Sequence, residues 1–363
     1  MSGKDEYYMK QALGLAAKGT GFTSPNPLVG CVMVKNNRVI STAFHKKAGA
    51  FHAERLAIMK AGKKAKGADL YVNLEPCAHY GKTPPCTDII ISSGVKRVVI
   101  AMKDPNPLVK GKGIRKMRNA GCKVQSGTLK KEAEKLNRIF IKNMKERMPY
   151  VLVKAGMSLD GKIALKNGKS KWITSPASRK HAQGLRKQTD AVLVGINTVL
   201  KDNPSLSCRT DKKKKVKKII LDTKGRIPLN AKLFKNTEPE HVYVFTRKME
   251  RKKIKALTKR GVNIIIAKTE KKSIAERFVL KTLFKKGIMS ILVEGGSCAA
   301  TSFIKKKFVD EINLYITPKI IGGDGLGFFG NMNFRNMKNI LRLKNTEVDK
   351  ISGDIMIKGK IKY

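Results

Sequence analysis

A histidine, a glutamate and two cysteines constrain the fold of this chain more than any other feature of its sequence. The segment His52-Ala53-Glu54 opens a helical pattern, and Pro76-Cys77 and Pro85-Cys86 follow a predicted strand and its loop. Catalytic zinc sites use about three protein ligands, drawn from nitrogen, sulfur and oxygen atoms, and leave one position to water. The chain should therefore fold so that His52, Cys77 and Cys86 converge on one cation.

Glu54 lies in the same helical turn as His52, close to the cation without being one of its ligands. A carboxylate in that place can take a proton from water and hand it to a leaving amine. H-x-E followed by P-C-x-x-C is the signature of zinc nucleobase deaminases, although here eight residues, 78–85, separate the cysteines. The alternative is two unrelated buried thiols and a hydrogen-bonded histidine at a helix start. The joint occurrence of all these parts favours the zinc site.

The remaining composition is that of a globular protein with two domains. Of the 363 residues, 41% are hydrophobic and 29% are charged, and about 150 residues is a common domain size. No apolar run approaches the ~18 residues of a membrane helix, and residues 1–10 do not resemble a secretory signal. The six cysteines are scattered, which argues for reduced thiols. We therefore expect a cytoplasmic protein with no membrane partner.

The formal net charge of +50 would attract nucleic acid or any other anion. The basic residues are mostly lysines spread along the whole chain, and aromatic residues make up only 6%, so platforms on which bases stack are scarce. We interpret the charge as biased amino-acid usage and expect no specific nucleic-acid partner. A phosphorylated substrate would still be attracted.

Strand and helix patterns alternate along the chain and predict α/β domains with covered sheets. A helix is expected over residues 5–18 and a hairpin over 28–44 that turns at Asn36-Asn37, followed by alternating elements. The strand pattern restarts at Tyr150, so the domain boundary is placed between residues 147 and 148. In the second half, strands are expected at 150–154, 191–194, 218–222, 242–246, 262–267, 288–294 and 311–316.

Longer motifs make the sequence similar to one enzyme family. They are T-S-P-N-P at 23–27, L-E-P-C at 74–77 with its continuation to Cys86, D-P-N-P at 104–107, W-I-T at 172–174 and D-N-P-S-L at 202–206. Over nearly its whole length, the chain resembles the bifunctional deaminase and reductase of riboflavin biosynthesis. The resemblance implies a cytidine-deaminase-like three-layer α/β/α domain over residues 1–147 and a dihydrofolate-reductase-like α/β domain over 148–363.

For the first domain, the resemblance implies hydrolytic deamination of a diamino-ribosylamino-pyrimidinone phosphate. One zinc ion per chain would bind His52, Cys77 and Cys86, and Glu54 would move the protons. The family's substrate contacts map onto side chains that suit a pyrimidine edge or a phosphate. They are Asn26, His45, His79, Lys82, Asp104 and Asn106.

For the second domain, the resemblance implies that NADPH reduces the ribosyl group, opened as an imine, to a ribityl chain. The domain has no G-x-G-x-x-G after its first strand, but its Gly295-Gly296 turn before a helix can hold a phosphate. The implied NADPH contacts are Gly156, Trp172, Thr198, Asp202, Thr223, Gly296, Ser297, Cys298, Ala299, Ala300, Thr301 and Ser302. The implied substrate contacts are Ser170, Arg186, Leu206, Arg209 and Glu294.

Two arginines, a lysine and an aspartate in this half have more specific expected roles. Arg186 and Arg209 are predicted phosphate clamps, because a guanidinium meets phosphate with two parallel hydrogen bonds. Lys154 and Asp202 are hypothesised to lie near the reacting carbon. Without the resemblance, Trp172, the single tryptophan, would be interpreted as a core anchor.

Two alternatives remain at this point. A nucleic-acid-modifying zinc deaminase would share the ligand set, but the long cysteine spacing and the reductase-like half argue against it. In the other alternative, the second half is a structural or degenerate partner of an active deaminase. The resemblance also implies a homo-oligomer, whose size the sequence does not give.

Overall fold

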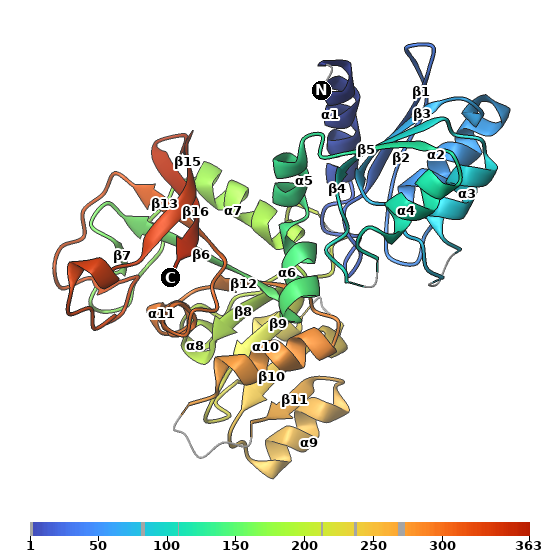
Figure 1. The fold of residues 1–363 in the computed structure, drawn as a ribbon. Helices are drawn as coiled ribbons and strands as arrows, with labels where there is room; N and C mark the ends of the chain where they lie inside the picture. Colours follow the sequence, from blue (N-terminus) through green and yellow to red (C-terminus); the bar gives the residue numbers. More distant parts are fainter. Residues whose placement is uncertain (1–2, 81–83, 108, 212, 236–237, 268–272) are drawn as a thin grey trace. The chain divides into compact units, whose positions relative to one another are not determined.

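The structure, a computed structural model, describes residues 3–80, 84–107, 109–211, 213–235, 238–267 and 273–363 (Figure 1). The chain divides into two compact units, Met1–Arg147 and Met148–Tyr363, each with its own hydrophobic core. Both units combine helices with sheets, so the predicted α/β fold class is confirmed. Within the described ranges, none of the helices has the length and apolar character that crossing a bilayer requires.

The N-terminal unit is built on a mixed sheet, which in the described residues has the order β2-β1-β3-β4-β5. Its strands are β1 (Gly30–Lys35), β2 (Arg38–Phe44), β3 (Asp69–Leu74), β4 (Arg97–Met102) and β5 (Lys123–Ser126). β1 is antiparallel to β2 and β3, whereas β3, β4 and β5 are parallel. Asn36 and Asn37 turn the β1–β2 hairpin with φ of 50° and 64°, in the left-handed region that asparagine tolerates. The predicted hairpin is confirmed.

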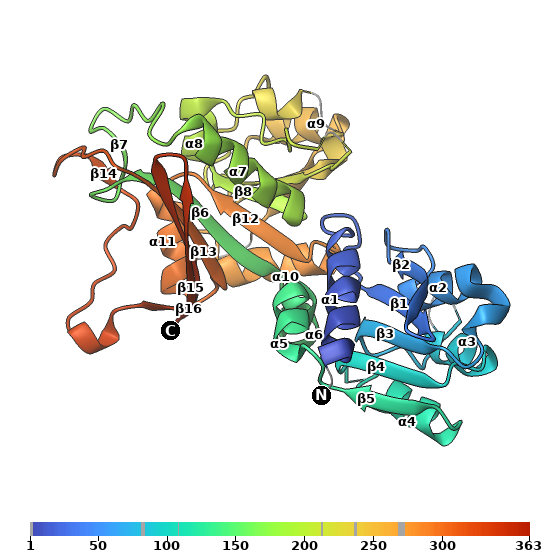
Figure 2. The same cartoon turned by 90° about the horizontal axis from the view of Figure 1, so that it is seen from above.

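Helices cover both faces of this sheet (Figure 2). On one face lie α1 (Gly3–Ala17) and α5 (Lys130–Leu136), and on the other lie α2 (Ala53–Ala61), α3 (Cys86–Ser92) and α4 (Lys112–Asn119); α6 (Arg138–Glu146) follows α5. Gly30 allows α1 to approach β1, because a Cβ at Gly30 would lie 2.1 Å from the Ala12 carbonyl oxygen. The parallel strands β3 and β4 end at the same edge of the sheet, where the polar residues after them are brought together.

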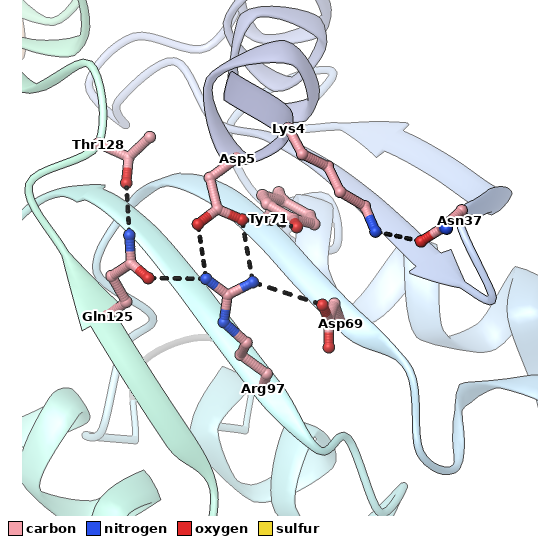
Figure 3. Close-up of polar contacts among 8 residues, drawn as sticks. All are labelled: Lys4, Asp5, Asn37, Asp69, Tyr71, Arg97, Gln125 and Thr128. Carbon is pink, nitrogen blue, oxygen red and sulfur yellow. Dashed lines mark hydrogen bonds and ion pairs between the residues drawn. The ribbon is translucent and has the colours of Figure 1, made fainter. Parts of the chain in front are cut away.

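At the opposite edge, where β3 and β4 begin, Arg97 joins α1 to the sheet (Figure 3). Its guanidinium donates to both carboxylate oxygens of Asp5, at 2.9 and 2.6 Å, and to Gln125 at 2.7 Å. Tyr71 donates a further hydrogen bond to Asp5 at 2.9 Å. Asp5 is only 3% exposed, and the hydrogen bond from Arg97 holds the pKa of this carboxyl below its usual range. The charge of Asp5 therefore depends on Arg97.

We expect Arg97→Met to lower the free energy of unfolding of the N-terminal unit by about 3 kcal/mol, because it leaves the buried Asp5 carboxylate without its main partner. The folded pKa of Asp5 is lowered, so its stabilisation is present above the unfolded pKa of about 3.9 and is lost as the pH falls through the folded value. Urea unfolding at neutral and at acidic pH checks this. Arg38→Met, at an exposed position of β2, should have little effect; equal losses for both variants would contradict the prediction.

The C-terminal unit is built on a longer sheet, whose described strands have the order β11-β10-β9-β8-β12-β6-β13-β16-β15. The strands from β11 to β13 are parallel, and β16 and β15 add an antiparallel hairpin. Buried, apolar parallel strands such as β8 and β10 are typical of a sheet covered on both faces. The strands are β6 (Tyr150–Ser158), β8 (Ala191–Gly195), β9 (Lys217–Leu221), β10 (Val242–Thr246), β11 (Asn263–Ile266), β12 (Ser290–Glu294), β13 (Glu311–Thr317), β15 (Arg342–Ile351) and β16 (Asp354–Lys362).

Helices and a second, small sheet complete this unit. The helices are α7 (Pro176–Gln188), α8 (Ile196–Asp202), α9 (Arg251–Lys259), α10 (Glu276–Lys285) and α11 (Ser297–Lys305). The small sheet pairs β7 (Lys162–Ala164) with β14 (Leu326–Gly327). Seven of the strands in the long sheet occur where the sequence patterns predict them, whereas β7, β14, β15 and β16 were not predicted.

Candidate functional site

His52, Cys77 and Cys86 converge in the N-terminal unit. His52 is the N-cap of α2, Cys77 follows β3, and Cys86 begins α3. Nδ1 of His52 lies 3.3 Å from Sγ of Cys86 and 3.6 Å from Sγ of Cys77, and the three ligand atoms all lie within 4.8 Å of one another. Tetrahedral zinc, with bonds of about 2.0–2.3 Å, separates its ligand atoms by about 3.5 Å. These residues therefore fit a zinc ion in both donor type and spacing.

The two thiols interact strongly. Hydrogen bonding from the Cys86 side chain, and then from His52, lowers the pKa of Cys77 to about 4. The backbone N–H of Cys86 also donates to Sγ of Cys77 at 3.3 Å. The pKa of Cys86 is raised, because it shares a proton with Cys77 and is buried. The opposite directions of the two pKa shifts favour ionisation of Cys77 before Cys86, and a divalent cation is the partner that would let both thiols ionise.

Glu54 lies in the first turn of α2 and is 3% exposed. Among the described residues, its Oε2 atom has no hydrogen-bond partner, and burial raises the pKa of the carboxyl. A buried carboxylate oxygen without a partner is costly for stability. A carboxyl beside this cluster of candidate metal ligands is suited to accept and return protons.

Asn26 and His45 lie next to this cluster. The Phe51 carbonyl can only accept a hydrogen bond, so Nδ1 of His45 donates to it at 3.2 Å. Nε2 of His45 then accepts from the Asn26 amide at 3.1 Å. Burial lowers the pKa of His45, and its ring meets the His52 ring edge-on with centroids 5.5 Å apart. Both contacts fit a neutral His45 ring that lies, with Asn26, beside His52.

The other predicted deaminase contacts lie in two loops. Asp104 and Asn106 follow β4, where Oδ1 of Asp104 accepts the Asn106 backbone N–H at 2.8 Å. Asp104 is buried, and burial raises its pKa to about 6. His79 lies exposed in the loop between the cysteines. Lys82, in the same loop, lies outside the described residues.

Glu75 is a buried residue of this region to which the sequence patterns assign no role. It lies between the end of β3 and Cys77, and its carboxylate accepts three backbone hydrogen bonds. The one sequence feature that could have pointed to Glu75 is its charge, because it lies between Leu74 and Pro76 at the end of an apolar strand.

In the C-terminal unit, a cavity of about 880 Å³ opens where β8, β9 and β12 end. Most of the predicted reductase residues line it: Lys154, Gly156, Ser170, Trp172, Arg186, Thr198, Asp202, Leu206, Arg209, Thr223, Glu294, Gly296, Ser297, Cys298, Ala299 and Ser302. Ala300 and Thr301 are not among its lining residues. Both are buried on the inner side of α11, where Oγ1 of Thr301 accepts the Gly330 N–H at 2.8 Å.

Arg186, a predicted phosphate clamp, contacts a carboxylate and a backbone carbonyl in the structure. Its Nε and Nη2 donate to the Glu294 carboxylate at 2.9 and 2.7 Å, and Nη1 donates to the Ser207 carbonyl at 2.8 Å. Three of the five N–H donors of this guanidinium are therefore used within the protein. Arg209 is exposed at the cavity, and the clamp role of both arginines stays a prediction. Burial acts to raise the pKa of Glu294, but the charge and hydrogen bonds of Arg186, together with the charges of Lys154 and Arg209, outweigh burial and lower that pKa.

Lys154 and Trp172 occupy different parts of this cavity. Lys154 lies opposite Glu294 in the backbone register of β6 and β12, and its Nζ lies 5.9 Å from the centroid of the Tyr315 ring. Burial lowers the pKa of Lys154. Trp172 is 64% exposed, and the Arg179 guanidinium lies 4.3 Å from its ring centroid. Trp172 is therefore not a core anchor, and its free ring face is open to a ligand.

Comparison with known proteins matches both units. The family model of the cytidine and deoxycytidylate deaminase zinc-binding region matches residues 2–102, and the model of the RibD C-terminal domain matches residues 149–357. Two relatives are riboflavin biosynthesis protein RibD of Aquifex aeolicus and of Bacillus amyloliquefaciens. The first is 46% identical, covering 97% of both chains, and the second is 45% identical, covering 97% of this chain and 95% of its own.

Solved structures agree over the full length. RibD of Acinetobacter baumannii, in its form 1, is 40% identical with a TM-score of 0.90 over 99% of each chain. A diaminohydroxyphosphoribosylaminopyrimidine deaminase/5-amino-6-(5-phosphoribosylamino)uracil reductase from Thermotoga maritima is 38% identical with a TM-score of 0.86 over 98% of each chain. Sequence similarity and structural similarity thus relate both units to the same group of proteins.

Proposed function

The chain belongs to the RibD family and is a bifunctional deaminase and reductase of riboflavin biosynthesis, and we propose that it acts on one phosphorylated pyrimidine in two steps. The N-terminal unit removes an amino group from the ring, and the C-terminal unit then reduces the ribosyl side chain. The observation that supports this proposal most is the convergence of His52, Cys77 and Cys86 beside the buried Glu54. The full-length relatives do not favour a nucleic-acid-modifying deaminase.

In the first step, His52, Cys77 and Cys86 would hold one zinc ion per chain. When bound, zinc supplies a Lewis acid that makes water at its open position more acidic. The Glu54 carboxylate accepts a proton from the attacking water and returns it to the leaving amine, so that C–N cleavage releases ammonia and leaves a carbonyl. Since two of these ligands are free thiols, we also infer a cytoplasmic location, where thiols stay reduced.

The predicted contacts divide between the ring and the phosphate of the substrate. The Asn26 and Asn106 amides and the Asp104 carboxylate offer hydrogen bonds to a pyrimidine edge, while neutral His45 orients Asn26. His79 and Lys82 are proposed to meet the phosphate, because both side chains can carry positive charge. The phosphate would thus lie at the loop between the cysteines.

The pKa of Asp104, raised to about 6 by burial, predicts an acid limb in the deaminase pH profile. Because ionised Asp104 accepts the hydrogen bond from the ring, kcat/KM for ammonia release should fall as the pH drops below about 6, by about tenfold per unit. Steady-state assays across this range check the prediction. Asp104→Asn should lower kcat/KM and abolish the limb; a limb near pH 6 that persists in this variant would contradict it.

In the second step, the cavity of the C-terminal unit would bind NADPH and the deaminated product together. We propose that NADPH lies along Gly156, Thr198 and the start of α11, with Trp172, Asp202 and Thr223 at its sides. The product would lie against Ser170, Leu206 and Arg209, beside the Glu294 carboxylate that Arg186 orients. NADPH supplies the hydride, and the protein supplies position and charge.

We also propose that Lys154 is the polar group near the reacting carbon. A Lys154→Ala variant that consumes NADPH at the wild-type rate would refute this hypothesis.

One assay tests the order of the two reactions. The chain is incubated with the diamino-pyrimidine phosphate, with and without NADPH, while ammonia and NADPH absorbance are followed. Ammonia should appear without NADPH, and NADPH should be consumed only after ammonia has been released. NADPH consumption that precedes ammonia release would contradict the proposal. If NADPH neither is consumed nor raises the melting temperature, the C-terminal unit is a degenerate partner.

We also propose that the chain forms a homo-oligomer. Met337 and Val348, near the end of the C-terminal unit, are 76% and 64% exposed. In the described part of the sheet, β15 is a terminal strand, so one of its edges has no neighbour. Exposed apolar side chains and a free strand edge both suit contact with a second copy. A monomer in sedimentation velocity at micromolar concentration would contradict this.

A further inference from the structure

Glu75 makes an unusual set of contacts for a side chain that touches none of the metal-binding atoms. It is 3% exposed, and all three of its described carboxylate contacts are backbone N–H groups. Oε2 accepts from Asp104 at 3.1 Å and from Gly111 at 3.0 Å, and Oε1 accepts from Ile114 at 3.2 Å. One buried carboxylate thus satisfies three donors, the kind of arrangement in which hydrogen bonds to a charged group are strong.

These donors lie at both ends of one loop. Asp104 opens the segment that follows β4, and Gly111 is the N-cap of α4, whose first turn contains Ile114. Two contacts of the Asn106 backbone within the loop are local: the Asn106 N–H donates to Oδ1 of Asp104, and the Asn106 carbonyl accepts from Val109 at 2.9 Å. Glu75 therefore ties this loop to the end of β3.

The backbone beside Glu75 is packed directly against the start of α4. A Cβ at Gly113 would lie 2.2 Å from the Pro76 carbonyl oxygen and 3.3 Å from Oε1 of Glu75. Only a residue without a side chain lets the helix come this close. The position of α4, and with it the end of the loop, is thus set by Glu75 and Pro76 together.

We propose that Glu75 is a positioning residue of the deaminase, which fixes Asp104 and Asn106 relative to Cys77. Cys77 follows Glu75 by two residues along the chain, so the same short segment carries a metal ligand and the anchor of the loop. Glu75 itself does not touch the pyrimidine. Its carboxylate fixes the positions of Asp104 and Asn106, which are proposed to contact the pyrimidine ring, relative to the proposed metal ligands. Glu75 thereby controls substrate affinity. This inference rests on the proposed deaminase function.

The test is Glu75→Gln in the full-length, zinc-loaded chain. Glutamine keeps the shape, but it places an N–H₂ group against a backbone N–H and has one acceptor oxygen where glutamate has two. We expect KM for ammonia release to rise about tenfold, with kcat within about threefold of the wild type. Zinc content and the NADPH-dependent reductase rate should stay unchanged. Glu132→Gln, at an exposed position of α5, is the matched control and should leave KM unchanged.

A second variant reaches the same loop without altering a charge. Gly113→Ala pushes the start of α4 away from the Pro76 carbonyl and should also raise KM more than it lowers kcat. Unchanged KM in Glu75→Gln would overturn the proposal. So would loss of zinc or of reductase activity in that variant, because the carboxylate would then serve folding rather than substrate position. A wild type that binds zinc but releases no ammonia would instead refute the deaminase function itself.

Discussion

Glu54→Gln should lower the rate of ammonia release by about a thousandfold while the chain keeps its zinc. Glutamine has the same shape as glutamate but cannot accept a proton from water and return it to the leaving amine. The proposed metal ligands are His52, Cys77 and Cys86, so the metal content should not change. Steady-state ammonia release and metal analysis of the same sample measure the two effects.

The reductase rate of this variant provides an internal control, because Glu54 lies in the N-terminal unit and the cavity residues all lie in the other unit. That rate, measured with the deaminated product as substrate, should equal the wild-type rate. Retention of ammonia release would remove Glu54 from the mechanism. Loss of zinc together with ammonia release would make Glu54 a ligand rather than a proton carrier.

Cys86→Ser should remove both the metal and the deaminase activity. Sγ of Cys86 lies 3.3 Å from Nδ1 of His52, and a serine hydroxyl at this position is a much poorer ligand for zinc than a thiolate. We expect zinc affinity to fall by more than about a hundredfold. This loss is larger than the loss expected when a residue that only orients a metal ligand is removed. Competition with a zinc-binding dye measures the affinity directly.

Cys122→Ser is the matched control for this prediction. Cys122 is also a buried free thiol, but its Sγ donates to the Val95 carbonyl at 3.3 Å, away from the ligand cluster. This variant should keep its zinc and its ammonia release. Equal zinc affinity in Cys86→Ser and the wild type would refute the ligand assignment, and equal losses in both cysteine variants would point to damaged folding instead.

The metal-ligand cluster was predictable because its signal lies in short, local segments. His52 begins a helix, and Cys77 and Cys86 lie at the ends of a loop between a strand and a helix, so each ligand has a recognisable neighbourhood. The hairpin at Asn36 and Asn37 was predictable for the same reason, since these residues tolerate positive φ between two strands. Both features required no knowledge of distant contacts.

Contacts between distant residues escaped prediction. Arg186 reaches Glu294 across 108 positions of the chain, and nothing beside either residue shows that the guanidinium is already paired. Glu75 finds its three donors between 29 and 39 positions away. In both cases the partner is set by strand order in the sheet, which a periodic pattern does not give.

Exposure explains two further differences. β15 is largely exposed along its length and is rich in charged residues, so it lacks the alternation of apolar and polar residues that marks a half-buried strand. The family resemblance implies that every residue of the segment 296–302 contacts NADPH. In the structure, residues 297–302 belong to α11, and the helical period turns Ala300 and Thr301 toward the core while their neighbours line the cavity.

X-ray absorption at the zinc edge of the wild-type chain tests the metal centre most directly. The spectrum should show one zinc per chain with two sulfur neighbours at about 2.3 Å and the remaining nitrogen or oxygen neighbours at about 2.0–2.1 Å. A shell without sulfur, or a chain that binds no zinc, would contradict the assignment of His52, Cys77 and Cys86 as the ligands.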